Sequence, residues 1–344
     1  MASYLERYQR GECSEVWTEM ALLSKTNSPE SAYVDATAVA EETMRRARRN
    51  LEILIPRLVS IGYRFGYDWI QPTSSGHLTP DARLSYFEAV DWARSQYPVF
   101  VPATAREELL TTLDKPRQRL LAIGADVLIS RLDELQQSVV SRPTMQQRLD
   151  VIEQAVGRLP LSIRAWYTIV GSVNFVGYSD AWLKLLPDDP DDVCSMYRLD
   201  PLVISPLEAS IQVYPLSTAT QLQETKPKPP LMPTWSRFNQ YDPAPVEPQW
   251  LNWKSNASGV KYRLELAKSP RGKYNAGPDD IGIEAELPQS GVDLDLVAAS
   301  QPIGLSFVNY LRTCFQWGGF PGWEQYQTRP DKELTYLTNG VEAI

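Results

Sequence analysis

The chain has 344 residues, of which 43% are hydrophobic and 10% aromatic, and this composition excludes a globally disordered protein. Its 34 basic and 42 acidic residues give a net charge of −8, which makes nucleic acid and anionic membranes poor general partners. The three cysteines form no Cys-x-x-Cys pair, and the first residues resemble neither a signal peptide nor a membrane span. We therefore expect a cytoplasmic protein with free thiols.

Residues 1–143 are predicted to form a helical N-terminal region. A short helix is expected over residues 5–23. Asp35 is suited to cap a long helix whose apolar positions recur every three or four residues from Ala40 to Leu58. Pro56 is expected to kink or shorten that helix, and Gly62 to end it. Further helical patterns cover residues 85–97 and 120–140.

Residues 144–344 are predicted to form an α+β domain, in which short apolar runs alternate with turns. Between these runs lies a Pro- and Trp-rich excursion at about residues 215–258. Ser162 is expected to cap one of the helices. The predicted helices cover residues 145–156, 163–170 and 307–315, and the predicted strands cover 202–204, 211–214, 262–266 and 281–285.

Four features of the sequence are candidates for sites of chemistry, and each has a simpler structural interpretation. His77, the single histidine, lies in a turn-rich segment that favours a solvated loop over a catalytic role. The basic run Arg45–Arg49 suggests a phosphate or acidic-partner site, but a solvated or intramolecularly paired helix face is favoured. Glu284 and Glu286 share one face of a predicted strand, where exposed carboxylates are far commoner than acid–base pairs. The run Gly318–Gly322 lacks the Lys-Ser/Thr of a phosphate loop and predicts a tight turn after a helix. We predict no catalytic residue, cofactor or metal site.

Two groups of residues are predicted to bind a partner. The first is the acidic run Asp188, Asp189, Asp191 and Asp192, which lacks the alternating ligands, Gly and distal Glu of a calcium loop and so favours solvent or a basic partner. The second is Trp235, Trp250 and Trp253 in the Pro-rich excursion. Tryptophan is enriched at interface hot spots, but these three could equally hold the excursion onto its own core.

The run Gly157–Pro160, followed by Trp166-Tyr167 and by Val170–Val173, resembles the SUKH superfamily. Three further segments resemble that family's first strand, a later Gly/Asp turn entering a strand, and its closing helix: Asp200–Ile204, Tyr274–Ile283 and Phe307–Leu311. The resemblance covers roughly residues 144–324. This region is longer than a usual SUKH domain, and the Pro/Trp-rich excursion is extra. The resemblance implies a sheet with helices packed around it, no cofactor, and most often an immunity protein that blocks a bacterial toxin. It carries over no partner-binding position.

These observations lead to three hypotheses of different classes. The first is a non-catalytic bacterial protein-binding module, an immunity protein whose acidic surface and tryptophans cover a basic toxin domain. The second is a structural or regulatory subunit of a larger bacterial assembly such as a defence complex, in which the helical region docks on sister subunits and the chain could self-associate. The least favoured is an enzyme that works through carboxylates such as Glu284.

Overall fold

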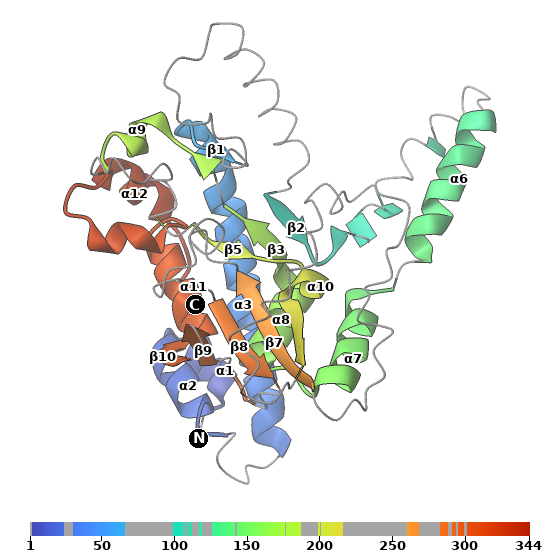
Figure 1. The fold of residues 1–344 in the computed structure, drawn as a ribbon, viewed down its shortest axis with the longest axis horizontal. Helices are drawn as coiled ribbons and strands as arrows, with labels where there is room; N and C mark the ends of the chain where they lie inside the picture. The colour runs from blue at the N-terminus through green and yellow to red at the C-terminus, as the bar shows by residue number, and fades with distance from the viewer. Residues whose placement is uncertain are drawn as a thin grey trace, which may run out of the picture.

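The computed structural model describes residues 2–23, 30–65, 99–105, 107–108, 110–111, 117–118, 126–141, 143–175, 177–186, 199, 201–215, 260–267, 283–287, 291–293, 295–298 and 301–344. These residues form helices together with small antiparallel sheets, which confirms the predicted α+β class at that level (Figure 1).

The N-terminal part consists of two short helices and one long one. α1 (Tyr4–Gln9) and α2 (Cys13–Met20) replace the single helix expected over residues 5–23. They are separated at Gly11, whose φ of +102° is a conformation that side-chain-bearing residues rarely adopt. α1 begins with a capping box, in which the Ser3 hydroxyl and the Glu6 carboxylate accept each other's backbone N–H.

The long helix α3 (Glu30–Ser60) runs through the middle of the molecule (Figure 1). Its ending is as predicted: Gly62 has φ +85°, and the N–H groups of Gly62 and Tyr63 reach back to the carbonyls of Val59 and Leu58. This pair of bonds is a Schellman motif, which satisfies the free carbonyls of a helix end. The buried stripe that holds the helix comprises Ala36, Val39, Ala40, Thr43, Met44, Ala47, Asn50, Leu51, Leu54 and Leu58.

The prediction for Asp35 was wrong, and of the two effects predicted for Pro56, a kink or a shortening, the shortening is contradicted. Pro56 does not shorten the helix, which continues to Ser60, because Leu54 and Leu58 on either side are buried and outweigh one lost backbone hydrogen bond. Asp35 does not cap α3, since it lies inside the helix. Its carboxylate instead accepts the backbone N–H groups of Tyr4 and Leu5, at 2.5 and 3.2 Å, and so caps α1.

Further helices follow α3 in the chain. α6 (Asp126–Val140) corresponds to the helix expected over residues 120–140, and α7 (Met145–Val156) agrees with its prediction. The helix expected over 163–170 begins earlier, as α8 (Leu161–Ala165), and continues as a π-helix (Trp166–Val170). Ser162 therefore lies inside α8 and is not its cap. The described part of the chain also contains the helices α9 (Asp180–Leu183), α10 (Leu207–Ser210), α11 (Phe307–Gln316), a 3-10 helix (Pro321–Gln325) and α12 (Asp331–Thr338). Of these helices, α8, the π-helix and α12 pack against α3.

Among the described residues, the strands form three antiparallel sheets. The largest has the order β10-β9-β8-β7-β6, a meander in which chain neighbours pair. A three-stranded sheet has the order β2-β3-β5, and β1 pairs with β4. All four predicted strands are present, as β5, β6, β7 and β8. The bounds are β1 Arg64–Phe65, β2 Phe100–Pro102, β3 Gly171–Asn174, β4 Gly177–Tyr178, β5 Val203–Ile204, β6 Ile211–Pro215, β7 Val260–Ala267, β8 Ile283–Leu287, β9 Asp295–Ala298 and β10 Gln301–Ser306.

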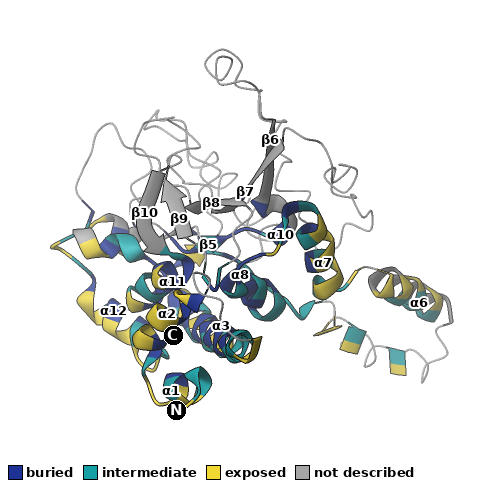
Figure 2. Cartoon of the chain, turned by 90° about the horizontal axis from the view of Figure 1, so that it is seen from below, coloured by how far each residue is buried: buried dark blue, intermediate teal, exposed yellow. Residues whose placement is uncertain are grey.

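The core crosses the boundary predicted near residue 143. α3 packs against α8 and the π-helix, and the buried sides of α3, α8 and α11 lie together in Figure 2. Trp166 contacts Phe307 edge to face, with ring centroids 5.5 Å apart. A second aromatic group joins β1, α9 and the 3-10 helix: Tyr63, Phe65, Phe175, Trp182, Phe320, Trp323 and Tyr326. The two predicted regions thus share one hydrophobic core among the described residues.

Candidate functional site

The arginines of α3 are paired within the chain, as the favoured interpretation predicted. Arg45 bonds Glu41 at 2.7 Å, and Arg48 reaches Glu52 and Glu108 at 3.0 and 3.1 Å. Arg46 and Arg49 contact Glu42 and the last residues of the sequence. A guanidinium held by carboxylates has little remaining capacity to bind phosphate. Arg46, Arg48 and Arg49 join α3 to other segments of the chain, whereas Arg45 pairs within α3.

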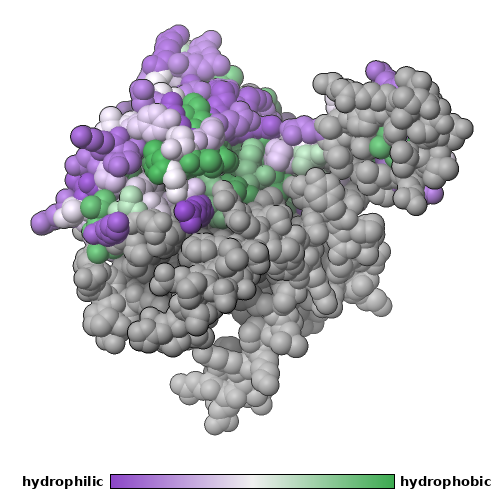
Figure 3. Space-filling model, turned by 90° about the horizontal axis from the view of Figure 1, so that it is seen from above, coloured by the Kyte–Doolittle hydropathy of each residue, from purple (hydrophilic) through white to green (hydrophobic). Residues whose placement is uncertain are grey.

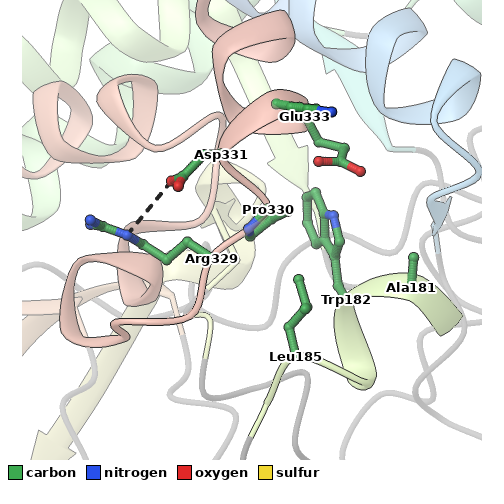
Figure 4. A pocket seen from close by; sticks show the side chains of 8 residues that line it. Ala181, Trp182, Leu185, Arg329, Pro330, Asp331 and Glu333 are labelled. Carbon is green, nitrogen blue, oxygen red and sulfur yellow. Dashed lines mark ion pairs between the residues drawn. The ribbon is translucent and has the colours of Figure 1, made fainter.

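The described surface is hollowed between α9 and the start of α12 (Figure 4). The depression has a volume of about 400 Å³. The residues that line it are Ala181, Trp182, Leu185, Arg329, Pro330, Asp331, Lys332 and Glu333. Figure 4 shows the Trp182 indole beside Pro330, with the Glu333 carboxylate above it and the Arg329–Asp331 pair to one side. An apolar floor thus meets a rim with two cations and two anions.

A helix cap and two ring contacts position the floor. The hydroxyl of Ser179 accepts the backbone N–H of Trp182 at 3.4 Å and so caps α9. The Trp182 side chain, 1% exposed, contacts Phe320 and Trp323 edge to face, with centroids 5.0 and 5.7 Å apart. Such contacts fix the ring orientation, because aromatic edges and faces carry opposite partial charge.

The cationic side of the rim is only loosely neutralised. The Arg329 guanidinium lies 5.0 Å from the centroid of the Trp317 ring, and its Nε is 3.9 Å from an Asp331 carboxylate oxygen. That distance is too long for a hydrogen bond. Within the described part of the chain, the buried Nε of Arg329 and the Nε1 atoms of Trp317 and Trp323 have no hydrogen-bond partner. All three atoms are buried, and Trp317 and Trp323 are not among the residues that line the depression.

The residues predicted to bind a partner lie outside the described residues: Asp188, Asp189, Asp191, Asp192, Trp235, Trp250 and Trp253, and also His77. The acidic run follows closely in the chain after Leu185 and Leu186, of which Leu185 lines the depression. Glu284 and Glu286 lie in β8, opposite Glu265 and Arg263 of β7 in the strand register.

The Gly-Gly turn is structural, as predicted. Gly318 has φ +63°, and the N–H groups of Gly318 and Gly319 return to the carbonyls of Phe315 and Cys314, which closes α11 with a Schellman motif. Sequence reasoning missed the depression itself. The signals available were the Arg-Pro-Asp start of a helix at 329–331 and a tryptophan just before the acidic run, but neither indicates that the two segments meet.

Hydrophobic residues gather in a band when the molecule is seen from above (Figure 3). The rest of the described surface in this view is mainly hydrophilic.

Among the described residues, His, Cys, Asp and Glu form no group of three or more placed to hold a metal ion. No described helix combines the length and apolar character needed to cross a bilayer.

The chain matched no protein-family model, no curated protein and no solved structure in the three comparisons made. The resemblance to the SUKH superfamily therefore stays a prediction from the sequence.

Proposed function

We propose that this chain is a non-catalytic protein-binding module, and specifically a cytoplasmic bacterial immunity protein that neutralises a toxin. The observation that carries the proposal is the depression between α9 and α12, where an apolar floor is surrounded by charged side chains. Protein interfaces have this anatomy, with a desolvated centre and a polar rim.

The acidic run supports a basic partner. Asp188, Asp189, Asp191 and Asp192 follow within a few residues of Leu185 in the chain. At the rim itself the carboxylates of Asp331 and Glu333 are balanced by Arg329 and Lys332, so the negative charge comes from the acidic run. Together with the net charge of −8, these four aspartates would attract a basic toxin domain over several ångströms and speed its encounter. Because the α3 arginines are already paired, they would not oppose that attraction. Inhibition in this proposal is steric: the bound protein covers the toxin's active site.

The test is a binding measurement with the product of a toxin-like coding sequence adjacent to the one for this chain. Calorimetry at low and moderate salt would compare the wild type with a variant in which the four aspartates become asparagine. We expect the variant to bind at least about tenfold more weakly and with a flatter salt dependence, because surface attraction is screened by ions. A Glu41→Gln, Glu52→Gln variant on α3 is the matched control and should bind as the wild type does.

Unchanged affinity and unchanged salt dependence in the aspartate variant would refute the acidic binding surface. Light scattering of the purified chain adds a separate check. A stable self-assembled oligomer with no affinity for the toxin would instead favour the second hypothesis, a subunit of a larger bacterial assembly.

A further inference from the structure

The last residues of the sequence, Val341–Ile344, follow α12 without regular secondary structure and lie against α3 and α11. We call this segment the tail. Ile344 is 3% exposed and belongs to the hydrophobic core, whereas Ala343 is exposed. Ile344 thus anchors the end of this segment in the core, while Ala343 next to it faces solvent.

The main chain of the tail is hydrogen-bonded by the buried side-chain amide of Asn50. The Nδ2 of Asn50 donates to the Glu342 carbonyl at 2.9 Å, and the Glu342 N–H donates to the Asn50 Oδ1 at 2.7 Å. This reciprocal pair reproduces the bonds that a neighbouring β-strand would make. Asn50 itself is fully buried, so its amide would be costly to leave without these partners.

The Glu342 side chain of the tail is bound by the guanidinium of Arg49. Arg49 donates from Nε and Nη2 to the two carboxylate oxygens of Glu342, at 2.6 and 2.9 Å. Bidentate geometry of this kind selects a carboxylate over an amide or a hydroxyl, because both oxygens must accept. Two further arginines hold the backbone beyond it. Arg46 donates to the Ala343 carbonyl at 2.9 Å, and the Nε of Arg312 donates to the Ile344 main-chain oxygen at 2.6 Å.

The same two arginines also hold the start of α2. The Nη1 of Arg46 lies 3.5 Å from the Cys13 Sγ, and the Nη2 of Arg312 donates to the Cys13 carbonyl at 3.0 Å. Cys13 is 5% exposed. Removal of the tail would take an acceptor from each arginine and loosen the end of α2 that buries this thiol.

We propose that α3 and α11 form a recognition site for a short acidic peptide of the type Glu-Ala-Ile, which the tail occupies in cis. The determinants are a carboxylate for Arg49, a backbone amide for Asn50 and an apolar side chain two residues further on. A peptide with this chemistry binds in trans when the tail is weakened, and it restores the protection of Cys13. The proposal is independent of the binding function proposed above.

The experiment uses the full chain with a weakened tail, Glu342→Gln with Ile344→Ala, and a fluorescent peptide with the sequence of residues 339–344. Anisotropy measures binding, and alkylation by iodoacetamide followed by peptide mapping measures the reaction of each cysteine. We expect the variant to bind the peptide at least about tenfold more tightly than the wild type, whose site is filled, since a tethered ligand competes at high effective concentration. Cys13 should react faster in the variant, and saturating peptide should slow it again.

Two controls separate recognition from general loosening. The Glu→Gln version of the peptide should bind about tenfold more weakly, a loss of about 1.4 kcal/mol. Adding Arg49→Gln to the variant, a change at a half-exposed side chain, should also weaken the unmodified peptide. Cys314, which is fully buried in α11, reports global opening and should not gain reactivity.

Protection of Cys13 by the peptide, with Cys314 unreactive, supports the proposal. If Cys13 and Cys314 react together and the peptide slows neither, the tail is only part of the core and the proposal is overturned. The proposal is also overturned if the peptide binds the wild type and the variant equally well. The same holds if the peptide and its Glu→Gln version bind with equal affinity.

Discussion

The carboxylate of Asp35 in α3 accepts the backbone N–H of Tyr4 at a distance of 2.5 Å, so a residue within one helix caps another helix 31 positions earlier in the sequence. The bond fixes the first turn of α1 on α3, where Tyr8 and Cys13 then complete the N-terminal part of the core. The start of the chain is thereby held by a tertiary contact as well as by its own capping box.

Replacing Asp35 should therefore destabilise the fold although the residue is only partly buried. We expect Asp35→Ala to lower the free energy of unfolding by about 1 kcal/mol, the usual cost of losing an N-terminal cap. Unfolding in urea, monitored by circular dichroism, measures this free energy. Glu41→Ala on the same helix loses only an exposed pair with Arg45 and should cost no more than about 0.5 kcal/mol. Equal effects of the two changes would refute the capping role.

Gly319 is expected to tolerate no side chain. Its φ is +97°, and a Cβ there would lie 2.5 Å from the Phe175 ring. Gly319→Ala combines backbone strain with overpacking and should cost on the order of 3 kcal/mol. Gly62 is the matched control, because its φ is +85° and nothing lies within 4 Å of a Cβ. Gly62→Ala should cost about 1–2 kcal/mol, and a thermal unfolding series that gave the two variants the same midpoint would contradict the steric argument.

The contact between Arg49 and Glu342 should weaken in acid. The hydrogen bonds from Arg49 hold the pKa of Glu342 below its ordinary value of 4.5. The Glu342 carboxylate thus binds a proton less readily in the folded state than in the unfolded state. Its contribution to stability is therefore present above pH 4.5 and is lost as the pH falls through the folded pKa. Wild type and Glu342→Gln should differ in free energy of unfolding by up to about 1 kcal/mol near neutrality and converge in acid. A difference that stays constant with pH would contradict the ionised pair.

The contribution of Tyr8 to stability should fall as the pH rises, which is opposite to the pH dependence expected for Glu342. Burial raises its pKa from 10.0 to about 12, because the phenolate would be poorly solvated in the core. The unfolded state loses this proton first, so the contribution of Tyr8 to stability is complete below pH 10 and declines as the pH rises toward 12. The ultraviolet absorbance of the wild type minus that of Tyr8→Phe should show tyrosinate only above about pH 11. Ionisation near pH 10 in the folded protein would show that the hydroxyl is accessible.

Much of the secondary structure follows from local sequence. Residues 145–156 repeat apolar positions at helical spacing behind a Thr-x-x-Gln cap, and α7 occupies that range. Residues 262–266 alternate and lie in β7, because a strand with two different faces needs that alternation wherever it lies. The glycines at 62 and 318 end their helices for the same local reason, a positive φ. The arginines of α3 flank an apolar stripe, which favours a solvated or intramolecularly paired face, and the structure shows the second of these alternatives.

Pro56 does not shorten α3 and Asp35 does not cap it for one physical reason, which is that burial outweighs local preference. A proline costs one hydrogen bond, whereas the leucines around it bury whole side chains. A carboxylate binds whichever free N–H groups the packing brings to it, and for Asp35 these belong to α1.

The sequence by itself determined the mixed helix and strand composition, the ends of several elements and the acidic character, because each depends on neighbouring residues or on residue counts alone. Only the tertiary structure decided that α9 meets α12 around Trp182, and that Glu342 lies on Arg49 and Asn50, 293 and 292 positions away. Such contacts depend on how the hydrophobic faces pack, and no local pattern records which distant segment will cover a given face.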